Sequence, residues 1–251
     1  MLREERHYHI LERLRSDGRV QTLDLSRALQ VSEDTLRRDL RDLAAAGKLQ
    51  RVHGGALPRS PLIGSVAERE GQAVQPKQAL ATATARLLQD GQVILMDGGT
   101  TNLQVARSLP RTLRATIVTA SPAIALALLP LPQVDVVLLG GRLDRETETA
   151  VGIATAEALH GVRADVCLLG ICSLHLEFGI SAAGGEEALI KRLMIAQSAE
   201  VIAAVVADKL GTAMPYVVGP AHELTHLVTE RFVPDAVVTP YTHLGITVVH
   251  G

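Results

Sequence analysis

The sequence predicts an α/β protein with a small, mostly helical N-terminal domain and a larger C-terminal domain built on a mostly parallel sheet. Apolar residues recur at helical spacing near the N-terminus, whereas short apolar strands alternate with helices from residue 77 onward. Strands that are apolar along their whole length are typical of a parallel sheet covered by helices on both faces. The 251 residues, 47% of them hydrophobic, suffice for one or two domains with a sizeable core.

Two helices are expected first along the chain. They cover Glu4–Ser16 and Thr22–Leu29, and Asp17-Gly18 breaks the chain between them. Their apolar positions at helical spacing are Ile10, Leu11, Leu14, Leu23, Leu25 and Leu29. Gln30-Val31 is then a tight connection into a third helix, so the segment has the order of a helix-turn-helix.

The third helix has a clear start signal at Ser32, whose hydroxyl can accept a hydrogen bond from an exposed backbone N–H. Leu36, Leu40 and Leu43 recur at helical spacing and form an apolar stripe. The polar residues that fall largely off this stripe are Thr35, Arg37, Arg38 and Arg41. A short helix with one face in a core and arginines on the other suits the major groove of DNA.

The segment Lys48–Ala56 after this helix is basic and rich in glycine at its end. We expect a hairpin that contacts the phosphate backbone of DNA and acts as a wing, which makes the domain a winged helix-turn-helix. The competing interpretation is a solvated amphipathic helix pair whose arginines only keep it soluble. A capped, arginine-bearing helix that leads into a basic hairpin favours DNA binding over that alternative.

Residues 3–57 resemble the DNA-binding domain of the DeoR family of bacterial transcription regulators. The matching words are Arg6–Leu14 (RHYHILERL), Gly18-Arg19-Val20, Val31–Leu40 (VSEDTLRRDL) and Arg51–Ala56 (RVHGGA). The resemblance implies that the recognition helix carries Ser32, Thr35, Arg37 and Arg38. It also implies that Arg51 and His53 lie on the wing.

Charge and composition fit a DNA-binding domain joined to a domain that does not bind DNA. Residues 1–59 carry 12 lysines and arginines against 9 acidic residues, and the remainder carries 13 against 18. No apolar run is long enough to span a membrane and the N-terminus is charged, so we expect a cytoplasmic protein. Cys167 and Cys172 are expected to be small buried residues rather than a disulfide or a metal site.

The expected domains are 1–57 for the winged helix-turn-helix, 58–76 for a linker and 77–251 for the α/β domain. The linker lacks periodicity, and within it Val66–Glu70 is expected to be a short strand or turn. The expected strands of the larger domain are Val93–Met96, Ala115–Thr119, Val134–Leu139, Val166–Gly170, Val201–Ala207, Leu227–Thr229 and Ile246–Val249. Its expected helices are Lys77–Gln89, Asn102–Leu109, a helix that opens at Ser121-Pro122, and Gly185–Ala199.

Ligands of such sheets bind at the carboxyl ends of the strands, where the small and polar residues of this chain gather. The clearest case is Asp97-Gly98-Gly99-Thr100-Thr101, directly after a strand. The glycines let the backbone approach a ligand, the threonines add hydroxyls, and the following helix presents free N–H groups, as in a phosphate cradle. The sequence matches neither a P-loop nor a GxGxxG fingerprint, and an ordinary strand-to-helix turn is the alternative.

Residues at other strand ends favour a pocket over a simple turn. These candidates are Thr119, Ser121, Gly140, Gly141, Lys191 and Lys209. Taken singly they are more often a capping serine, a turn glycine or a solvated lysine. Together they indicate a pocket for a small phosphorylated polyol, in which the lysines supply positive charge to an anion.

Residues 77–230 also resemble the DeoR family, whose C-terminal sensor domain is similar to the ribose-5-phosphate isomerase type of fold. The matching words are Asp97–Thr101, Val118-Thr119, Leu138–Gly141, Gly152, Ala164-Asp165, Lys191-Arg192 and Ala207-Asp208. The resemblance implies an effector site for a sugar phosphate whose phosphate is held by residues 97–101.

The sequence departs from the family pattern at three places. Ala120 stands where the family often has Asn, and Asp208-Lys209 is a contracted form of its Asp-x-x-Lys, which weakens Lys209 as a ligand contact. The segment Ile171–Ile180 lacks the acidic pair usual in isomerase-like enzymes, which argues against catalysis.

His222-Glu223-Leu224-Thr225-His226 matches the H-E-x-x-H pattern of zinc proteases. That pattern needs a helix of several turns, because both histidines must lie on one helix face. Here Gly219-Pro220 comes just before and an expected strand follows at once, so we expect a surface turn instead.

We therefore expect a sequence-specific DNA-binding regulator, a repressor of a carbohydrate-metabolism operon that a phosphorylated sugar releases from its operator. The expected partners are double-stranded operator DNA, the effector and further copies of the chain in a dimer or tetramer. No catalytic residue, cofactor, metal or membrane is expected. The alternatives are a sugar-phosphate isomerase-like enzyme, which a turnover assay would reveal, and a zinc hydrolase, which metal analysis would reveal.

Overall fold

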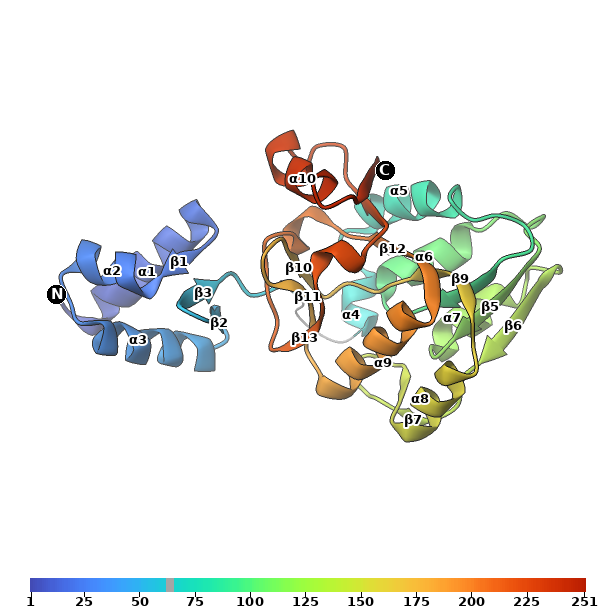
Figure 1. Cartoon of the computed structure of the whole chain (residues 1–251), viewed down its shortest axis with the longest axis horizontal. Helices are drawn as coiled ribbons and strands as arrows, with labels where there is room; N and C mark the ends of the chain where they lie inside the picture. The colour runs from blue at the N-terminus through green and yellow to red at the C-terminus, as the bar shows by residue number, and fades with distance from the viewer. Residues whose placement is uncertain (62–65) are drawn as a thin grey trace.

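The computed structural model describes residues 1–61 and 66–251. A small N-terminal domain and a larger α/β domain lie end to end, which gives the molecule an elongated shape (Figure 1). Arg19 of the small domain pairs with Glu177 of the larger one, and its guanidinium carbon lies 5.6 Å from the ring centre of Phe178. The two domains therefore touch through side chains as well as through the connecting chain.

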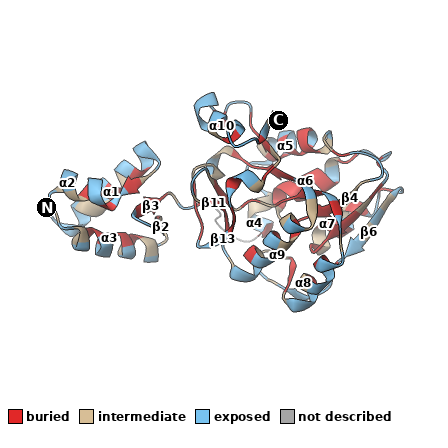
Figure 2. Ribbon diagram, in the orientation of Figure 1, coloured by how far each residue is buried: buried red, intermediate tan, exposed pale blue. Residues whose placement is uncertain are grey.

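The N-terminal domain packs helices against a small antiparallel sheet. The helices are α1 (Arg3–Asp17), α2 (Thr22–Leu29) and α3 (Glu33–Ala45), and the strands are β1 (Val20–Gln21), β2 (Gln50–Val52) and β3 (Gly55–Leu57), in the order β1-β3-β2. The core is formed by Ile10, Leu14, Val20, Leu25, Leu36, Leu40, Leu43, Leu49 and Ala56. Its buried residues lie on the inner sides of the helices (Figure 2). Leu23 does not join this core, because it is 46% exposed.

The larger domain is built on a parallel sheet, which confirms the predicted fold class. Within the described residues this sheet has seven strands in the order β15-β14-β12-β9-β4-β5-β6, and each neighbouring pair is parallel. The strands are β4 (Val93–Met96), β5 (Ala115–Thr119), β6 (Val134–Leu138), β9 (Ala164–Leu168), β12 (Ser198–Ala204), β14 (His226–Thr229) and β15 (Thr247–His250).

Helices cover both faces of this sheet, as continuously apolar strands require. On one face lie α5 (Val74–Ala85), α6 (Thr100–Ser108) and α7 (Pro122–Leu128), which share an apolar cluster with β4 and β5. On the other lie α8 (Ile153–His160), α9 (Gly185–Ala196) and α10 (Asp235–Thr242), which share a second cluster. Connections β4-α6-β5 and β5-α7-β6 progress toward one edge of the sheet, and the later strands progress toward the other.

Smaller elements that were absent from the sequence-based expectation lie near the ends of the main strands. An antiparallel sheet has the order β10-β11-β13, and a hairpin joins β7 to β8. Their bounds are β7 (Arg142–Leu143), β8 (Ala150–Val151), β10 (Ser173–His175), β11 (Gly179–Ala182) and β13 (Tyr216–Gly219), and single 3-10 turns cover Ala207–Lys209 (η1) and Ala221–Glu223 (η2). The β10-β11-β13 sheet lies on the side of the larger domain that faces the N-terminal domain (Figure 1).

The connection between the domains is more ordered than a linker expectation implies. Val66–Glu70 forms a short helix, α4, rather than a strand or turn, and α5 begins at Val74 inside the expected linker. The Lys77 ammonium explains this order, because it donates hydrogen bonds to the carbonyl oxygens of Arg69 and Gln72, at 2.5 and 2.6 Å. Lys77 thus ties the end of α4 to the first turns of α5.

Candidate functional site

The recognition helix α3 begins where its capping residue predicts. The Ser32 hydroxyl accepts a hydrogen bond from the backbone N–H of Thr35 at 3.3 Å, which satisfies one of the free donors at the helix start. Leu36, Leu40 and Leu43 are buried in the core. The opposite face is exposed and carries Arg37, Arg38 and Arg41.

The two α3 arginines that were predicted to contact DNA are held differently. Arg37 pairs with Glu33 at 3.0 Å and with Asp34 at 3.3 Å, both one turn earlier on the same helix. Arg38 is exposed and forms no ion pair with any described residue. A groove between α3 and the wing is lined by Arg37, Arg51 and His53 among others, so the structure brings these three predicted residues together.

A buried aspartate, which sequence reasoning missed, fixes the orientation of α3. Asp39 accepts hydrogen bonds from the Arg6 guanidinium at 2.7 and 3.0 Å and lies 3.2 Å from the His7 ring nitrogen Nε2. Both partners come from α1, so the contact clamps α1 across the back of the recognition helix. The same hydrogen bonds raise the pKa of Arg6 above its ordinary value. An acidic residue directly after two arginines was the available signal.

The larger domain has a cavity of about 200 Å³ at the carboxyl ends of β4 and β9. The strand order reverses between these two strands, because β5 and β6 follow on one side of β4 and β12, β14 and β15 follow on the other side of β9. Parallel sheets bind ligands at this kind of switch point, since the two outgoing connections diverge and leave a crevice.

Residues 97–101 line this cavity as the sequence predicted. Gly99 has φ +106°, and a Cβ on Gly98 would lie 2.3 Å from Thr149, so both positions favour glycine. The backbone N–H groups of Gly99, Thr100 and Thr101 and both threonine hydroxyls form no hydrogen bond with any described residue. They are therefore available to a ligand at the N-terminus of α6, which carries a partial positive charge.

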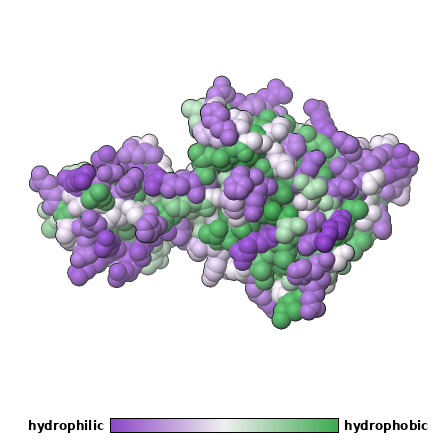
Figure 3. Space-filling view, in the orientation of Figure 1, coloured by the Kyte–Doolittle hydropathy of each residue, from purple (hydrophilic) through white to green (hydrophobic). Residues whose placement is uncertain are grey.

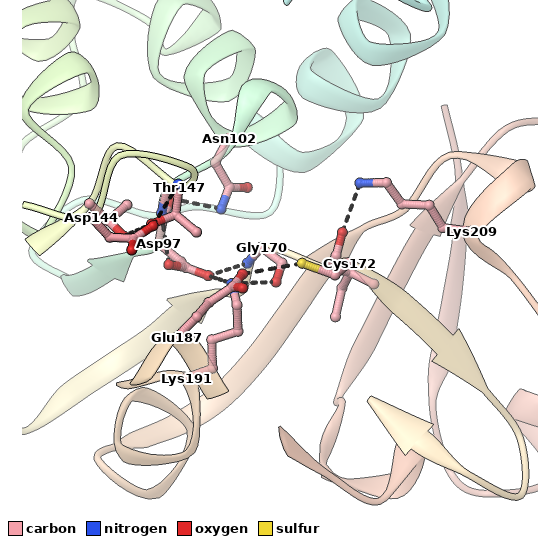
Figure 4. A network of polar contacts seen from close by, with 12 residues as sticks. Asp97, Asn102, Asp144, Thr147, Gly170, Cys172, Glu187, Lys191 and Lys209 are labelled. Carbon is pink, nitrogen blue, oxygen red and sulfur yellow. Dashed lines mark hydrogen bonds and ion pairs between the residues drawn. The ribbon is translucent and has the colours of Figure 1, made fainter. Parts of the chain in front are cut away.

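A buried charge cluster forms the base of the cavity (Figure 4). The Lys191 ammonium binds a carboxylate oxygen of Asp97, donates to the carbonyl of Gly170 at 2.8 Å and lies 3.3 Å from Glu187. Burial opposes the charged form of Lys191, but the two carboxylates outweigh it and raise its pKa. Asp97 also accepts from the backbone N–H groups of Gly98 at 2.8 Å and Gly170 at 2.9 Å.

Cys172 and Lys209 extend the cavity wall away from this cluster (Figure 4). The Cys172 thiol lies 3.2 Å from Glu187, and burial together with that carboxylate raises its pKa to about 11. The Lys209 ammonium donates to the carbonyl of Ile171 at 2.7 Å. Burial and the positive charges of Arg69 and Lys77 lower its pKa to about 8.

The remaining predicted residues do not line the cavity, although Ser121 lies beside Gly98, which does. Thr119, Ser121, Gly140 and Gly141 are not among its lining residues. Ser121 caps α7 and Thr119 accepts from the Ser121 N–H at 3.1 Å, whereas the carbonyl of Gly140 accepts from Thr155 at 2.8 Å. These residues lie at the ends of β5 and β6, and both strands lie beyond β4 on the far side from the switch point.

Several lining residues were not predicted. They are Arg59, Arg69, Asn102, Glu146, Thr147, Thr149, Gly170, Cys172 and Glu187, with some apolar neighbours. Glu187 lies one helical turn before Lys191, a spacing that could have indicated it. Arg59 and Arg69 come from the connection between the domains, and no local pattern marks them.

The H-E-x-x-H segment does not have the geometry of a zinc-protease helix. His222 and Glu223 lie in the single 3-10 turn η2, and His226 is the first residue of β14. The His226 ring lies 2.9 Å from the Thr225 hydroxyl. Because a turn and a strand separate the two histidines, they do not share a helix face.

The fold and these two sites define a class of protein. A winged helix-turn-helix with exposed arginines is joined to an α/β domain with a polar cavity at its switch point, as in ligand-responsive transcription regulators. Among the residues that the structure describes, no helix is long and apolar enough to cross a membrane.

Comparison with known families agrees with this class of protein and identifies the family within it. The chain matches the DeoR-like helix-turn-helix domain over residues 6–60 and the DeoR C terminal sensor domain over residues 72–231. The protein therefore belongs to the DeoR family and is a DNA-binding transcriptional regulator.

Individual relatives cover most or all of the chain. The HTH-type transcriptional regulator GlpR of Haloferax volcanii is 33% identical over 255 residues, which span 100% of this chain and 99% of that protein. The glycerol-3-phosphate regulon repressor of Escherichia coli is 30% identical over 212 residues, 84% of each chain. A ribose 5-phosphate isomerase from Methanocaldococcus jannaschii aligns with 53% of this chain and 52% of its own, with a TM-score of 0.39 and 16% identity.

Proposed function

We propose that this regulator represses a carbohydrate-metabolism operon and that a phosphorylated sugar or polyol releases it from its operator. One observation carries the proposal: free backbone N–H groups at the N-terminus of α6 and a buried carboxylate cluster line the same cavity of about 200 Å³. A ligand that fits both must carry an anion at one end and hydrogen-bond donors at the other.

A phosphorylated sugar has this chemistry. Its phosphate suits the N–H groups and hydroxyls of Thr100 and Thr101, since helix N-termini bind anions. Its hydroxyls suit Glu187, whose Oε2 atom is buried and without a hydrogen-bond partner among the described residues. A buried acceptor left without a partner is costly, so a ligand hydroxyl that donates to it gains affinity. A relative named for the glycerol-3-phosphate regulon supports the same class of ligand.

On the DNA side, the proposed contacts are Ser32, Thr35, Arg37 and Arg38 from α3 and Arg51 and His53 from the wing. Arg38 is the foremost candidate for a base contact, because no described residue pairs with it. The hydrophilic surface of the N-terminal domain contrasts with apolar patches on the larger domain (Figure 3).

We further propose that the regulator binds DNA as a dimer or tetramer. One winged domain offers little surface, and tight operator binding generally needs two domains on repeated half-sites. Exposed apolar side chains at the β6 edge of the sheet support association through the larger domain: Leu126 on α7, Leu129 directly after α7 and Leu138 on β6 are 68%, 67% and 50% exposed.

We propose no catalytic role for the cavity. Both oxygens of Asp97 already accept hydrogen bonds, from Lys191 and from the N–H groups of Gly98 and Gly170, which makes this carboxylate a poor base. Incubation with ribose 5-phosphate and other sugar phosphates should give no product. Repeated conversion of a sugar phosphate to product by the wild type, lost in Lys191→Met, would favour the isomerase-like alternative.

A ligand screen tests the proposal most directly. Thermal unfolding of the full chain is measured with a panel of sugar and polyol phosphates and with their unphosphorylated forms. A phosphorylated member should raise the melting temperature, because a ligand that binds only the folded state stabilises it. The same compound should weaken operator binding in a gel-shift assay at fixed salt. Stabilisation by unphosphorylated sugars alone would contradict the proposal.

A further inference from the structure

The cavity contains more positive charge than its carboxylates neutralise. Lys191 is compensated by Asp97 and Glu187. Arg59, Arg69 and Lys209 also line the cavity, and none of them forms an ion pair with a carboxylate among residues 1–61 and 66–251. Glu146 is the remaining lining carboxylate, and it is exposed to solvent.

Arg69 and Lys209 repel each other, and Lys77, which lies near them but does not line the cavity, repels both. Burial lowers the pKa of Lys77 first, and the charge of Arg69 lowers it further. Burial is the largest cause that lowers the pKa of Lys209, and Arg69 and Lys77 lower it further, whereas Cys172 and Asp208 favour the charged form. Positive groups that line one cavity and are not paired with a carboxylate are typical of a binding site for an anion, since the anion removes both the repulsion and the desolvation cost.

Arg59 also contacts the DNA-binding domain. It follows β3 of the wing by two residues. One of its guanidinium nitrogens lies 3.1 Å from the position that a Cβ on Gly47 would take, and Gly47 is in the turn between α3 and β2. The side chain of Arg59 thus touches the turn that follows the recognition helix, although the residue lines the cavity of the other domain.

The backbone around Arg59 is fixed to the cavity wall. The carbonyl of Pro58 accepts a hydrogen bond from the Ala213 N–H at 3.2 Å, and Arg59 pairs with Ala213 as a parallel bridge. The buried Ser60 hydroxyl donates to the carbonyl of Cys172, itself a lining residue, at 2.5 Å. A movement of this wall therefore moves the chain that leads directly into the wing.

We propose that Arg59 and Arg69 complete the anion-binding part of the effector site and that Arg59 transmits its occupancy to the DNA-binding domain. The inference rests on the proposed function, because it assumes an anionic effector in this cavity. A helix N-terminus supplies only about half a positive charge, so a phosphate dianion there needs further cations. An anion that draws the Arg59 guanidinium inward removes its contact with the turn at Gly47, and a ligand acts through such a difference between two states.

The test compares full-length variants in two measurements. Calorimetry gives the affinity for inorganic phosphate and for the phosphorylated compound that stabilises the wild type. Gel shifts give operator affinity with and without saturating compound, and their ratio measures the coupling. The variants are Arg59→Ala, Arg59→Lys and Arg69→Ala, with Arg111→Ala as the control, because Arg111 is exposed and lies outside the cavity.

Arg59→Ala and Arg69→Ala should each weaken both ligands by about 10-fold to 100-fold, the range for a lost hydrogen bond to a charged group. At saturating compound, Arg69→Ala should keep the wild-type coupling ratio, whereas Arg59→Ala should bring the ratio close to one. Arg59→Lys should restore most of the affinity but little of the coupling, since lysine keeps the charge without the planar fork. Arg111→Ala should match the wild type in both measurements.

Two results would overturn the inference. Wild-type affinity for phosphate in both Arg59→Ala and Arg69→Ala would place the anion elsewhere. In that case the proposed function would still stand if Thr100→Val no longer bound the effector. A wild-type coupling ratio in Arg59→Ala would remove its role in transmission. If neither phosphate nor any phosphorylated compound bound the wild type, the inference and the proposed function would fail together.

Discussion

Asp97 and Lys191 form a buried ion pair at the carboxyl ends of β4 and β9, although 94 residues separate them in the sequence. Asp97 directly follows β4, and Lys191 lies on α9, which packs on the opposite side of the cavity. The pair therefore joins the two halves of the sheet at the switch point, and Glu187 adds a second carboxylate to the same ammonium.

Lys191→Met should destabilise the protein by about 3–5 kcal/mol, because it leaves two buried carboxylates without their cation. Urea unfolding at neutral pH measures this change. Lys48→Met is the control, since Lys48 is exposed and pairs with no described residue, and it should cost less than about 0.5 kcal/mol. A loss below about 1 kcal/mol in Lys191→Met would show that the ion pair contributes little.

Thr100→Val should leave operator binding intact and weaken the effector by about tenfold, because it removes a hydroxyl from the anion site while nearly keeping the volume. Gly99→Val should weaken the effector further, since the +106° φ of Gly99 disfavours any side chain. Calorimetry on the full chain measures both effects. Thr82→Val on the exposed face of α5 is the control. Unchanged effector affinity in both site variants would place the phosphate elsewhere.

Arg38→Ala should weaken binding to the specific operator by about 1–3 kcal/mol, more than it weakens binding to unrelated DNA. Arg37→Ala should have a smaller effect, because Glu33 and Asp34 already hold the Arg37 guanidinium. Gel shifts at one salt concentration, with specific and random duplexes, separate the two kinds of contact. Equal losses on both duplexes would make Arg38 a phosphate contact.

Effector affinity should fall as the pH rises through about 8, where the half-buried Lys209 ammonium loses its proton. Cys172, Asp208, Arg69 and Lys77 are the other charged or titratable groups that act on it. The phosphate is already a dianion above about pH 7, so its own titration adds little. Calorimetry between about pH 7 and pH 9 measures the trend. Lys209→Arg stays charged and should flatten it, and an equal slope in that variant would exclude Lys209 as the cause.

The lowered pKa of Lys209 also makes the stability of the folded state depend on pH. The folded state binds the Lys209 proton less tightly than the unfolded chain, whose lysine has the ordinary value of 10.5. The charged group therefore destabilises the folded state below a pH of about 8, and this cost disappears as the pH rises toward 10.5.

Purified protein should contain no stoichiometric zinc at residues 222–226, and His222→Ala or Glu223→Ala should leave DNA and effector binding unchanged. The reason is that η2 and β14 do not place the two histidines on one helix face. Elemental analysis after removal of loosely bound metal measures the zinc content. One zinc per chain that is lost in His222→Ala would contradict this expectation.

The parts of the fold that depend on local patterns could be predicted from the sequence. The Ser32 cap, the leucine stripe of α3 and the glycines before α6 each act within one or two helical turns. The order of the strands is not local, and it decides which strand ends meet. Gly140 does end a strand region, but β5 lies between β6 and β4, so this glycine stays away from the cavity.

Residues that reach the site over long sequence distances could not be predicted in this way. Arg59 meets the cavity because the connecting chain returns to Ala213, and Cys172 meets Glu187 because a small antiparallel sheet begins there. The strands of that sheet are so short that apolar and polar residues do not alternate along them for long enough to indicate a strand. The pairing of Asp97 with Lys191 likewise depends on how α9 packs across the sheet.

The amide of Asn102 donates to the carbonyls of Asp97 and Leu168, each at 3.0 Å, and so holds the ends of β4 and β9 together without help from any ligand. The proposed phosphate side of the cavity is thus pre-organised, and binding there loses little conformational freedom. The adjoining wall is the loop between β7 and β8, where the Asp144 carboxylate shapes a turn by accepting from the Thr147 backbone N–H at 2.9 Å. Thr147 and Thr149 of this loop line the cavity. If the proposed site is correct, exchange of these loop residues changes which sugar is selected while the proposed anion cradle stays the same.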